Sequence, residues 1–403
     1  MLVVKTNFNE LDESMNTVNA IVSDKLLNDN FRNAIFRIKG DRVQIAAYNG
    51  NVTSLTDLHS FIEKPEGYPE ESFVQFKAKE IMDVLNAFKG LRKTKVEDVE
   101  FHIEDTQAVM LIKEVPLDDE MDNADKYNQV SRFRITMPRL EKVTQDAISR
   151  LEVEVEGEVV NTSQFLIYID SLLPTVAKET RESTSNVMFS DEWVYTALAN
   201  YTAVLDNKLP EVFRGFRLKN STVSFVKNFI SGSEEFEIHK EVANGKMVIL
   251  TLKVGNAVAS IQCADMSRSL DMSNYVKTSE NRIAIDKDYL FDVLKRIGLD
   301  TNGASVSVEF TEDGATMTVA SKQMKQDIPV ERAKGVGSYS FVMKADLFAS
   351  LILSHMSVFT GQVYLYFEEN KTGQTEMSVK DNTGLWQTKI MGMSPAKSDF
   401  SWV

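Results

Sequence analysis

The residues that could carry out acid–base, nucleophilic or metal chemistry are few and scattered. The four histidines, His59, His102, His239 and His355, lie far apart in the sequence, and none has a second histidine or cysteine nearby. Metal sites built on a helix or hairpin need such ligands at short, fixed spacings. The single cysteine, Cys263, cannot form an intrachain disulfide. We therefore expect the histidines to be structural.

Motifs that bind phosphate, calcium or an acyl group are also missing. The chain contains no G-x-x-x-x-G-K-[ST], G-x-G-x-x-G or G-x-S-x-G sequence. The acidic stretch Asp118–Asp125 lacks the central Gly and the terminal Glu of a calcium loop, so we expect a solvated loop there. The sequence favours a protein that is not an enzyme and that holds no metal or cofactor.

Composition limits the function classes further. The 403 residues include 45 Lys and Arg against 59 Asp and Glu, a formal charge of −14, which argues against a protein that coats nucleic acid through its overall charge. Apolar runs such as Leu347–Leu353 are far too short to span a membrane, and no export signal is visible at the N-terminus. With one cysteine, the expected setting is a reducing cytoplasm.

The elements that must organise this chain are revealed by an internal repeat. Phe76–Leu85, Ile285–Leu294 and Met343–Ile352 align without gaps, each with an extended apolar approach, a polar first turn and a helical face. In the first copy that face is Ile81, Val84, Leu85 and Phe88, spaced i, i+3, i+4, i+7. In the third copy His355 takes the fourth position, which predicts a core histidine.

Alternating strands around polar turns follow each of these helices. The expected strands are Val96–Ile103, Ala108–Glu114 and Ser131–Met137; Ser305–Phe310, Ala315–Ser321 and Gln326–Arg332; and Gln362–Glu368, Glu376–Asp381 and Leu385–Met391. Three weaker copies complete the pattern. The first has a helix near Asn9–Leu26, and another starts at Phe216–Ile230. The least clear copy has a strand at Phe165–Ile169 and a helix near Asp170–Glu182, with Pro174 in its first turn. We predict six β-α-β-β-β repeats.

Six such repeats in three pairs resemble the DNA sliding clamp, the bacterial beta-type polymerase processivity factor. Ser131–Pro138 resembles the strand that closes that family's first domain, Phe76–Leu85 the opening of its second half-domain, and Ile390–Met393 its last strand. The resemblance implies an α+β fold with three clamp domains, 1–146, 147–277 and 278–393, followed by a tail at 394–403. Helices would line a ring, antiparallel sheets would lie outside, and two chains would join head to tail.

The function implied by the resemblance is a non-enzymatic ring. It would encircle duplex DNA without sequence preference and tether a DNA polymerase and other replication proteins, with a clamp loader as a further partner, at the nucleoid or another replication site. The acidic insertion Val115–Gln129, the extra stretch Leu151–Val160 and the tail depart from the family pattern. Such divergence would suit a clamp from a phage.

Charge and resemblance together predict the site residues. Formal charges over the expected helices sum to +1 and leave −15 for the rest of the chain. The candidate DNA-binding residues on the inner helices are Lys79, Lys89, Lys93, Lys219, Lys227, Lys295 and Arg296. The candidates that the resemblance implies for a partner-peptide pocket are Leu198, Tyr201, Val223, Ile390, Met391 and Met393, although Ala197–Ala203 lacks the family's Asp-Gly-His-Arg-Leu motif.

The tail and the rival functions remain open. Phe400 and Trp402 place two aromatic side chains in the tail, which suggests docking on the loader, the polymerase or the clamp's own pocket. The alternatives to a ring are a monomeric clamp-like factor that holds DNA electrostatically and a phage structural protein built of repeated α+β modules. An enzyme with a dispersed site is least favoured, because no nucleophile and base can be paired.

Overall fold

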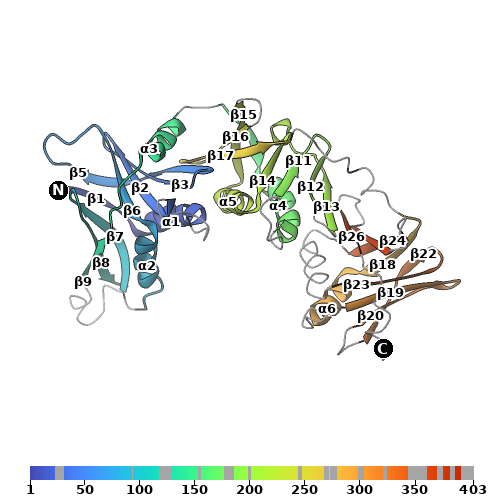
Figure 1. The fold of residues 1–403 in the computed structure, drawn as a ribbon. Coiled ribbons are helices and arrows are strands. Elements are labelled where there is room, and N and C mark those ends of the chain that lie inside the picture. The colour runs from blue at the N-terminus through green and yellow to red at the C-terminus, as the bar shows by residue number, and fades with distance from the viewer. Residues whose placement is uncertain are drawn as a thin grey trace. The chain divides into compact units, whose positions relative to one another are not determined.

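The computed structural model describes most of the chain. The described residues are 1–22, 31–92, 94–117, 129–152, 156–176, 186–197, 201–243, 247–266, 272, 279–297, 304–320, 325–343, 361–369, 375–381 and 386–391. The chain divides into two compact units: unit 1 comprises residues 1–162 and 224–263, and unit 2 comprises 163–223 and 264–403. As the sequence predicts, the fold is α+β, with helices beside antiparallel strands in each unit (Figure 1).

The elements follow one another in a repeating order. Up to residue 162 they are β1 (Leu2–Asn7), α1 (Phe8–Val22), β2 (Asn33–Lys39), β3 (Arg42–Tyr48), β4 (Val52–Leu58), β5 (Ser60–Glu63), β6 (Glu71–Lys77), α2 (Ala78–Phe88), β7 (Thr94–Ile103), β8 (Ala108–Pro116), β9 (Gln129–Ile135), α3 (Lys142–Ser149), η3 (Arg150–Glu152) and β10 (Glu158–Asn161).

The second part of the chain repeats this order. Its elements are α4 (Thr162–Val176), β11 (Asn186–Phe189), β12 (Trp193–Ala197), β13 (Tyr201–Asp206), η4 (Glu211–Phe213), β14 (Phe216–Lys219), α5 (Asn220–Ile230), β15 (Glu235–Ala243), β16 (Met247–Val254), β17 (Ala257–Asp265), β18 (Asn281–Asp286), α6 (Lys287–Ile297), β19 (Ala304–Thr311), β20 (Gly314–Ala320), β21 (Lys325–Ile328), β22 (Arg332–Lys334), β23 (Ser338–Met343), β24 (Gln362–Glu369), β25 (Thr375–Asp381) and β26 (Trp386–Met391).

Two antiparallel strand pairings join sets of four strands into longer sheets. In the first joint, which lies in unit 1, β4 pairs with β17, so that β6-β2-β3-β4 continues into β17-β16-β15-β10. In the second joint, which lies in unit 2, β13 pairs with β26, so that β14-β11-β12-β13 continues into β26-β25-β24-β18. The two joints have the same strand order, which is the structural form of the sequence repeat.

Two further sets of four strands have the same order but meet no partner set. One is β9-β8-β7-β1 in unit 1, where β5 adds to the outer side of β1, and the other is β23-β19-β20-β21 in unit 2. Within the described strands, β9 pairs only with β8, and β21 pairs only with β20. Each set therefore ends in an edge strand at the position that the joints fill elsewhere.

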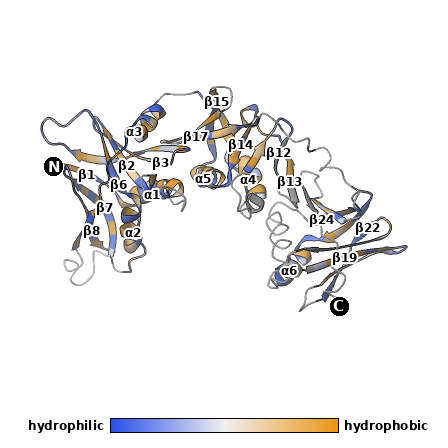
Figure 2. Cartoon of the chain, in the orientation of Figure 1, coloured by the Kyte–Doolittle hydropathy of each residue, from blue (hydrophilic) through white to orange (hydrophobic). Residues whose placement is uncertain are grey.

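Aromatic side chains anchor the core of each unit. In unit 1, Phe36 packs edge-to-face on Phe76 and on Phe101, with ring centroids 4.9 and 5.0 Å apart. In unit 2, Phe189 stacks on Phe216 at 4.8 Å. All five rings are fully buried, and hydrophobic and hydrophilic residues along the strands can be followed in Figure 2.

Most of the repeat is confirmed within a few residues. The predicted hairpin strands coincide with β7, β8, β19, β20, β24 and β25, and the predicted helices with α1, α2, α5 and α6. The closing strand expected at Ser131–Met137 is β9. His355, the helix of the third copy and most of the acidic insertion Val115–Gln129 lie outside the described residues.

One prediction about the fourth helix is wrong. Phe165–Ile169, expected as a strand, lies inside α4, and Pro174 is near the end of this helix rather than in its first turn. The buried residues Phe165, Tyr168, Ile169 and Leu172 follow the i, i+3, i+4, i+7 pattern of a helix. Proline removes one backbone hydrogen bond, and burial of this face outweighs that cost. The strand that precedes the helix is β10, which overlaps the extra stretch Leu151–Val160.

Two smaller differences have local causes. The sequence pattern does not predict helix α3, because its apolar face is short: Thr144 and Ile148 are buried, and Ile148 packs with Ile35, Ala46 and Leu55. The single strand predicted at Gln326–Arg332 is split into β21 and β22. Pro329 lies between them, where it has no N–H to contribute to a strand pairing.

The aromatic cluster of unit 1 predicts a large loss of stability when Phe101 is truncated. Phe101 is fully buried, so Phe101→Ala removes its contacts with Phe36 and Phe76 and should lower the free energy of unfolding by about 3–5 kcal/mol. Phe61 is 62% exposed, and Phe61→Ala should change it by less than about 0.5 kcal/mol. Urea unfolding followed by circular dichroism measures both. Equal losses in the two variants would contradict this assignment of the core.

Candidate nucleic-acid and partner interface

Several helices present uncharged polar side chains, beside some charged ones, on the faces turned away from the core. Helix α1 buries Phe8, Leu11, Met15 and Val18 and exposes Asn9, Asn16 and Asn19. The same division occurs elsewhere: the exposed residues include Asn86 on α2, Ser163 and Gln164 on α4, and Ser221 and Asn228 on α5. Asn, Gln and Ser side chains can hydrogen-bond phosphate and sugar oxygens, so these faces can contact a nucleic-acid backbone without a fixed charge.

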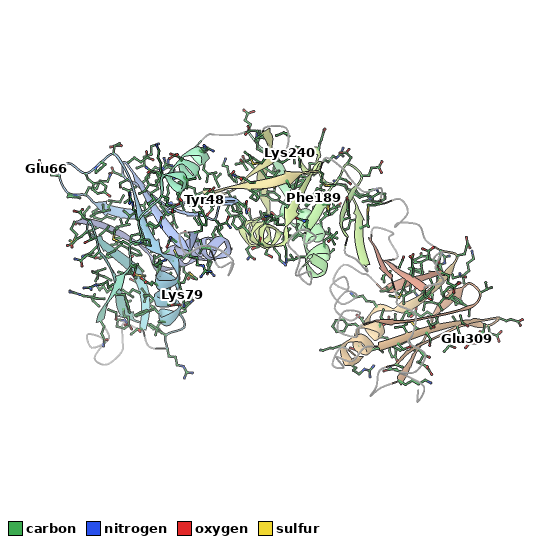
Figure 3. The ribbon with its side chains drawn as sticks, viewed as in Figure 1. Tyr48, Glu66, Lys79, Phe189, Lys240 and Glu309 are labelled. Atoms are coloured by element: carbon green, nitrogen blue, oxygen red, sulfur yellow. The ribbon has the colours of Figure 1, made fainter. Side chains whose placement is uncertain are left out.

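The predicted basic residues occupy less uniform positions. Lys79 on α2 is exposed, as are Lys295 and Arg296 in the last turn of α6, and Figure 3 labels Lys79. Lys219 is exposed at the end of β14. Lys89 caps the C-terminus of α2, and its Nζ lies 2.7 Å from a carboxylate oxygen of Asp12 on α1. Lys227 is only partly exposed, and Lys93 lies outside the described residues.

The described helices have a lower net charge than the helix ranges expected from the sequence. Lys77 and Lys89 lie just outside α2, so this helix keeps Lys79 against Glu80 and Asp83 and is net acidic. Helix α1 carries three acidic residues and no basic one. Only α5 and α6 among the helices described have a positive formal charge, +1 each. A nucleic-acid interface on these helices would make few charged phosphate contacts.

A polar cleft in unit 1 also has a lining with few charged side chains. It has a volume of about 760 Å³ and is lined by α1 and by the end of α5 with the residues that follow it. Its lining includes Asn16, Asn19 and Asn228, and Glu13 is its only ionisable residue. No cation is gathered there to hold a phosphate group. The cleft therefore fits a hydrated surface better than a tight anion site.

Three of the six residues predicted for a partner-peptide pocket lie on the strands of the second joint. Tyr201 pairs with Ile390 across the β13–β26 contact, and Met391 is the next residue of β26. Val223, near the start of α5, is fully buried. Leu198 and Met393 lie outside the described residues, as do Phe400 and Trp402 of the tail. Sequence alone could not show the β13–β26 pairing, because the paired residues are far apart in the chain.

The groups able to do chemistry remain separate in the part of the chain that the structure describes. No group of three or more His, Cys, Asp or Glu residues there could hold a metal ion. Cys263 is buried in β17, and burial raises the pKa of its thiol far above the usual range. His59 bonds Glu10 through Nδ1 at 2.6 Å in an exposed position. No described helix is long and apolar enough to cross a membrane.

The architecture matches solved structures over nearly the whole chain, although the two sequence comparisons found no match. No family model and no curated protein matches the chain. A putative DNA polymerase III beta subunit from Eubacterium rectale superposes with a TM-score of 0.72 at 12% identity, and the match covers 98% of this chain and 100% of that one. The DNA polymerase sliding clamp of Caulobacter crescentus matches at 0.71 and 13%, with the same coverage. The chain has the beta sliding clamp fold.

A further match is consistent with these two. DNA polymerase III subunit beta from Borrelia burgdorferi gives a TM-score of 0.71 at 14% identity and covers 98% of each chain. At such low identity a shared clamp fold must rest on the burial pattern rather than on particular side chains. The resemblance inferred from the six repeats is thus confirmed at the level of fold.

The buried thiol gives a direct test of this description. Because burial raises the pKa of Cys263, the native protein should not react with Ellman's reagent at pH 8, and it should release one equivalent of thiolate on unfolding in denaturant. Stability from this group is complete at low pH and is lost as pH rises above the unfolded thiol value of about 8.5. Rapid labelling of the native protein would show that β17 is not packed as described.

Proposed function

We propose that the chain is a DNA sliding clamp: a non-enzymatic processivity factor that encircles duplex DNA and tethers replication proteins to it. The observation that carries this proposal is the order of the strands. Two joints inside the chain unite sets of four strands, and the two remaining sets have the same order and end in the edge strands β9 and β21. An exposed edge strand offers unpaired N–H and C=O groups to another chain.

Pairing β9 of one chain with β21 of a second copy would make a third joint of the same type. Since the two edges are different surfaces, this contact is head to tail, and it closes into a ring when the rotation per chain allows it. With three domains per chain, at 1–146, 147–277 and 278–393, two chains would give six domains. A ring of this kind leaves none of the four-strand sets unpaired.

Retention on DNA would then be topological. The exposed helix faces carry Asn, Ser and Gln together with the acidic Glu13, Asp83, Asp288 and Asp292. Lys79, Lys295 and Arg296 are exposed cations among the predicted residues, and Lys89, Lys93, Lys219 and Lys227 are further candidates for loose phosphate contact. Few charged contacts mean weak direct affinity and a shallow dependence on salt. This property favours a ring that slides over a factor that grips DNA as a monomer.

The second joint is the proposed binding site for partner peptides. Tyr201 and Ile390 pair there, Met391 is the next residue of β26, and Leu198 and Met393 are close to them in sequence. Val223, buried in α5, is a further candidate. Peptides from a DNA polymerase and from a clamp loader are the expected ligands. Replication proteins work on chromosomal or viral DNA, so we expect the protein at replication sites in the cytoplasm.

Topological retention can be tested without a clamp loader. The protein is mixed with linear duplex DNA so that rings thread over its ends, and the DNA is then circularised by ligase. We expect complexes on the circles that persist in 1 M salt, because closure does not depend on charge, and that are released when a restriction enzyme recuts the DNA. Protein that leaves circles and linear DNA equally at high salt would support the monomeric factor instead.

The proposed third joint predicts that a charge on β9 separates the chains. Val130 is 56% exposed on this edge strand, and Val130→Glu would place a carboxylate, which loses hydration when the joint forms, at the proposed contact. The matched control is Val159→Glu on β10, where Val159 is 59% exposed. Sedimentation equilibrium should give twice the chain mass of 45.5 kDa for the wild type and the control, and the chain mass for Val130→Glu at micromolar concentration. A wild-type monomer, or an unchanged Val130→Glu dimer, would exclude this joint.

A further inference from the structure

A second cavity, separate from the proposed peptide site, lies at the first joint. It has a volume of about 400 Å³ and is lined by α3, by the ends of β3 and β4, and by strands β15, β16 and β17. This size falls in the range of protein sites that hold a small ligand or a few side chains. Tyr48, labelled in Figure 3, contributes from the end of β3.

Helix α3 divides its residues between the core and this cavity. Thr144 and Ile148 are buried. On the adjoining stripe, Val143, Asp146, Ala147 and Arg150 follow the spacing i, i+3, i+4, i+7 and line the cavity. Val143 is 53% exposed, although it is apolar. The helix therefore presents an unfilled apolar strip with charged side chains along it.

The charged residues that line the cavity have no ionic partner among the residues that the structure describes. Asp146, Arg150 and Glu241 all line it, and none of them makes an ion pair with another described residue. Asp146 and Arg150 are one helical turn apart, about 6 Å along the axis. A ligand with a cation and an anion at that spacing would complement both.

The cavity occupies the same place in the first joint that the proposed peptide site occupies in the second. Val52 pairs with Ile261 in the first joint as Tyr201 pairs with Ile390 in the second. Thr53 and Gln262, which line the cavity, are the neighbours of the first pair, and Met391 is the corresponding neighbour in the second. This correspondence, which rests on the proposed function, indicates a peptide as the occupant.

We propose that the cavity at the first joint binds the chain's own segment Ser394–Val403, from the same chain or from a second copy. In an extended peptide Lys397 and Asp399 lie on one side, about 6.6 Å apart, which matches the spacing of Asp146 and Arg150. Phe400 and Trp402 would lie on the other side of such a peptide and face the strand wall, where Tyr48 and Ile249 line the cavity. Both the charges and the apolar side chains are complementary.

Disulfide trapping tests this contact in the full chain. The variant Asp146→Cys with Lys397→Cys should cross-link several-fold faster than Gln145→Cys with Lys397→Cys, because Gln145 is exposed on α3 but does not line the cavity. The native Cys263 is buried and should not interfere. The mass of the product shows whether the tail comes from the same chain or another copy. Equal rates in the two variants would overturn the proposal.

A binding measurement gives a second, independent result. A fluorescein-labelled peptide with the sequence Ser394–Val403 is titrated with the full chain carrying Phe400→Ala and Trp402→Ala, so that the chain's own tail does not compete. Adding Ala147→Arg, which fills the cavity, should weaken binding at least about tenfold, whereas Ser149→Arg on another face of α3 should not.

A peptide that binds both arginine variants equally, or none of the chains, would show that the cavity does not hold the tail. Retention on circular DNA depends on the third joint rather than on this contact. Failure of the tail contact is therefore distinguishable from failure of the proposed function.

Discussion

The need to pair the edges of its sheets governs the organisation of this chain. Each repeat supplies a strand, a helix and three further strands, and the third of those strands is left at an edge. Two such edges meet in each internal joint, at β4 with β17 and at β13 with β26. Domains, helix positions and the proposed peptide sites are all defined relative to these two pairings. Among the described strands, β9 and β21 remain as edge strands at the corresponding positions. Pairing them with a second copy of the chain would satisfy their free backbone N–H and C=O groups.

Paired sheet edges and weakly charged helices are both consistent with retention on DNA by ring closure. A protein held on DNA by closure does not need strong phosphate contacts, and strong contacts would slow its movement. The net charge of −14 therefore has a structural counterpart in helices that expose Asn and Ser and use Lys89 to bind Asp12. The joints also explain why likeness to solved clamps survives at 12% identity: strand pairing uses the backbone, and the core requires only apolar side chains in the right pattern.

Sequence patterns predicted what is local and missed what is distant. Period-two strands and the helix at Ile81, Val84, Leu85 and Phe88 were readable because each depends on a few neighbouring residues. Pro174 misled the prediction for α4, although the stripe from Phe165 to Leu172 was present in the sequence. Contacts between residues far apart in the chain have no local sequence pattern that predicts them. They include the Lys89–Asp12 ion pair, the lining of the cavity beside α3 and both joints.

Imaging of the purified full-length protein by electron microscopy tests the central claim most directly. Pairing of β9 with β21 predicts an annulus of two chains, made of six similar domains around a hole wide enough for duplex DNA. The same particles should have twice the 45.5 kDa mass of the chain. Isolated single chains, open strings of chains or extended arrays at micromolar concentration would contradict the account.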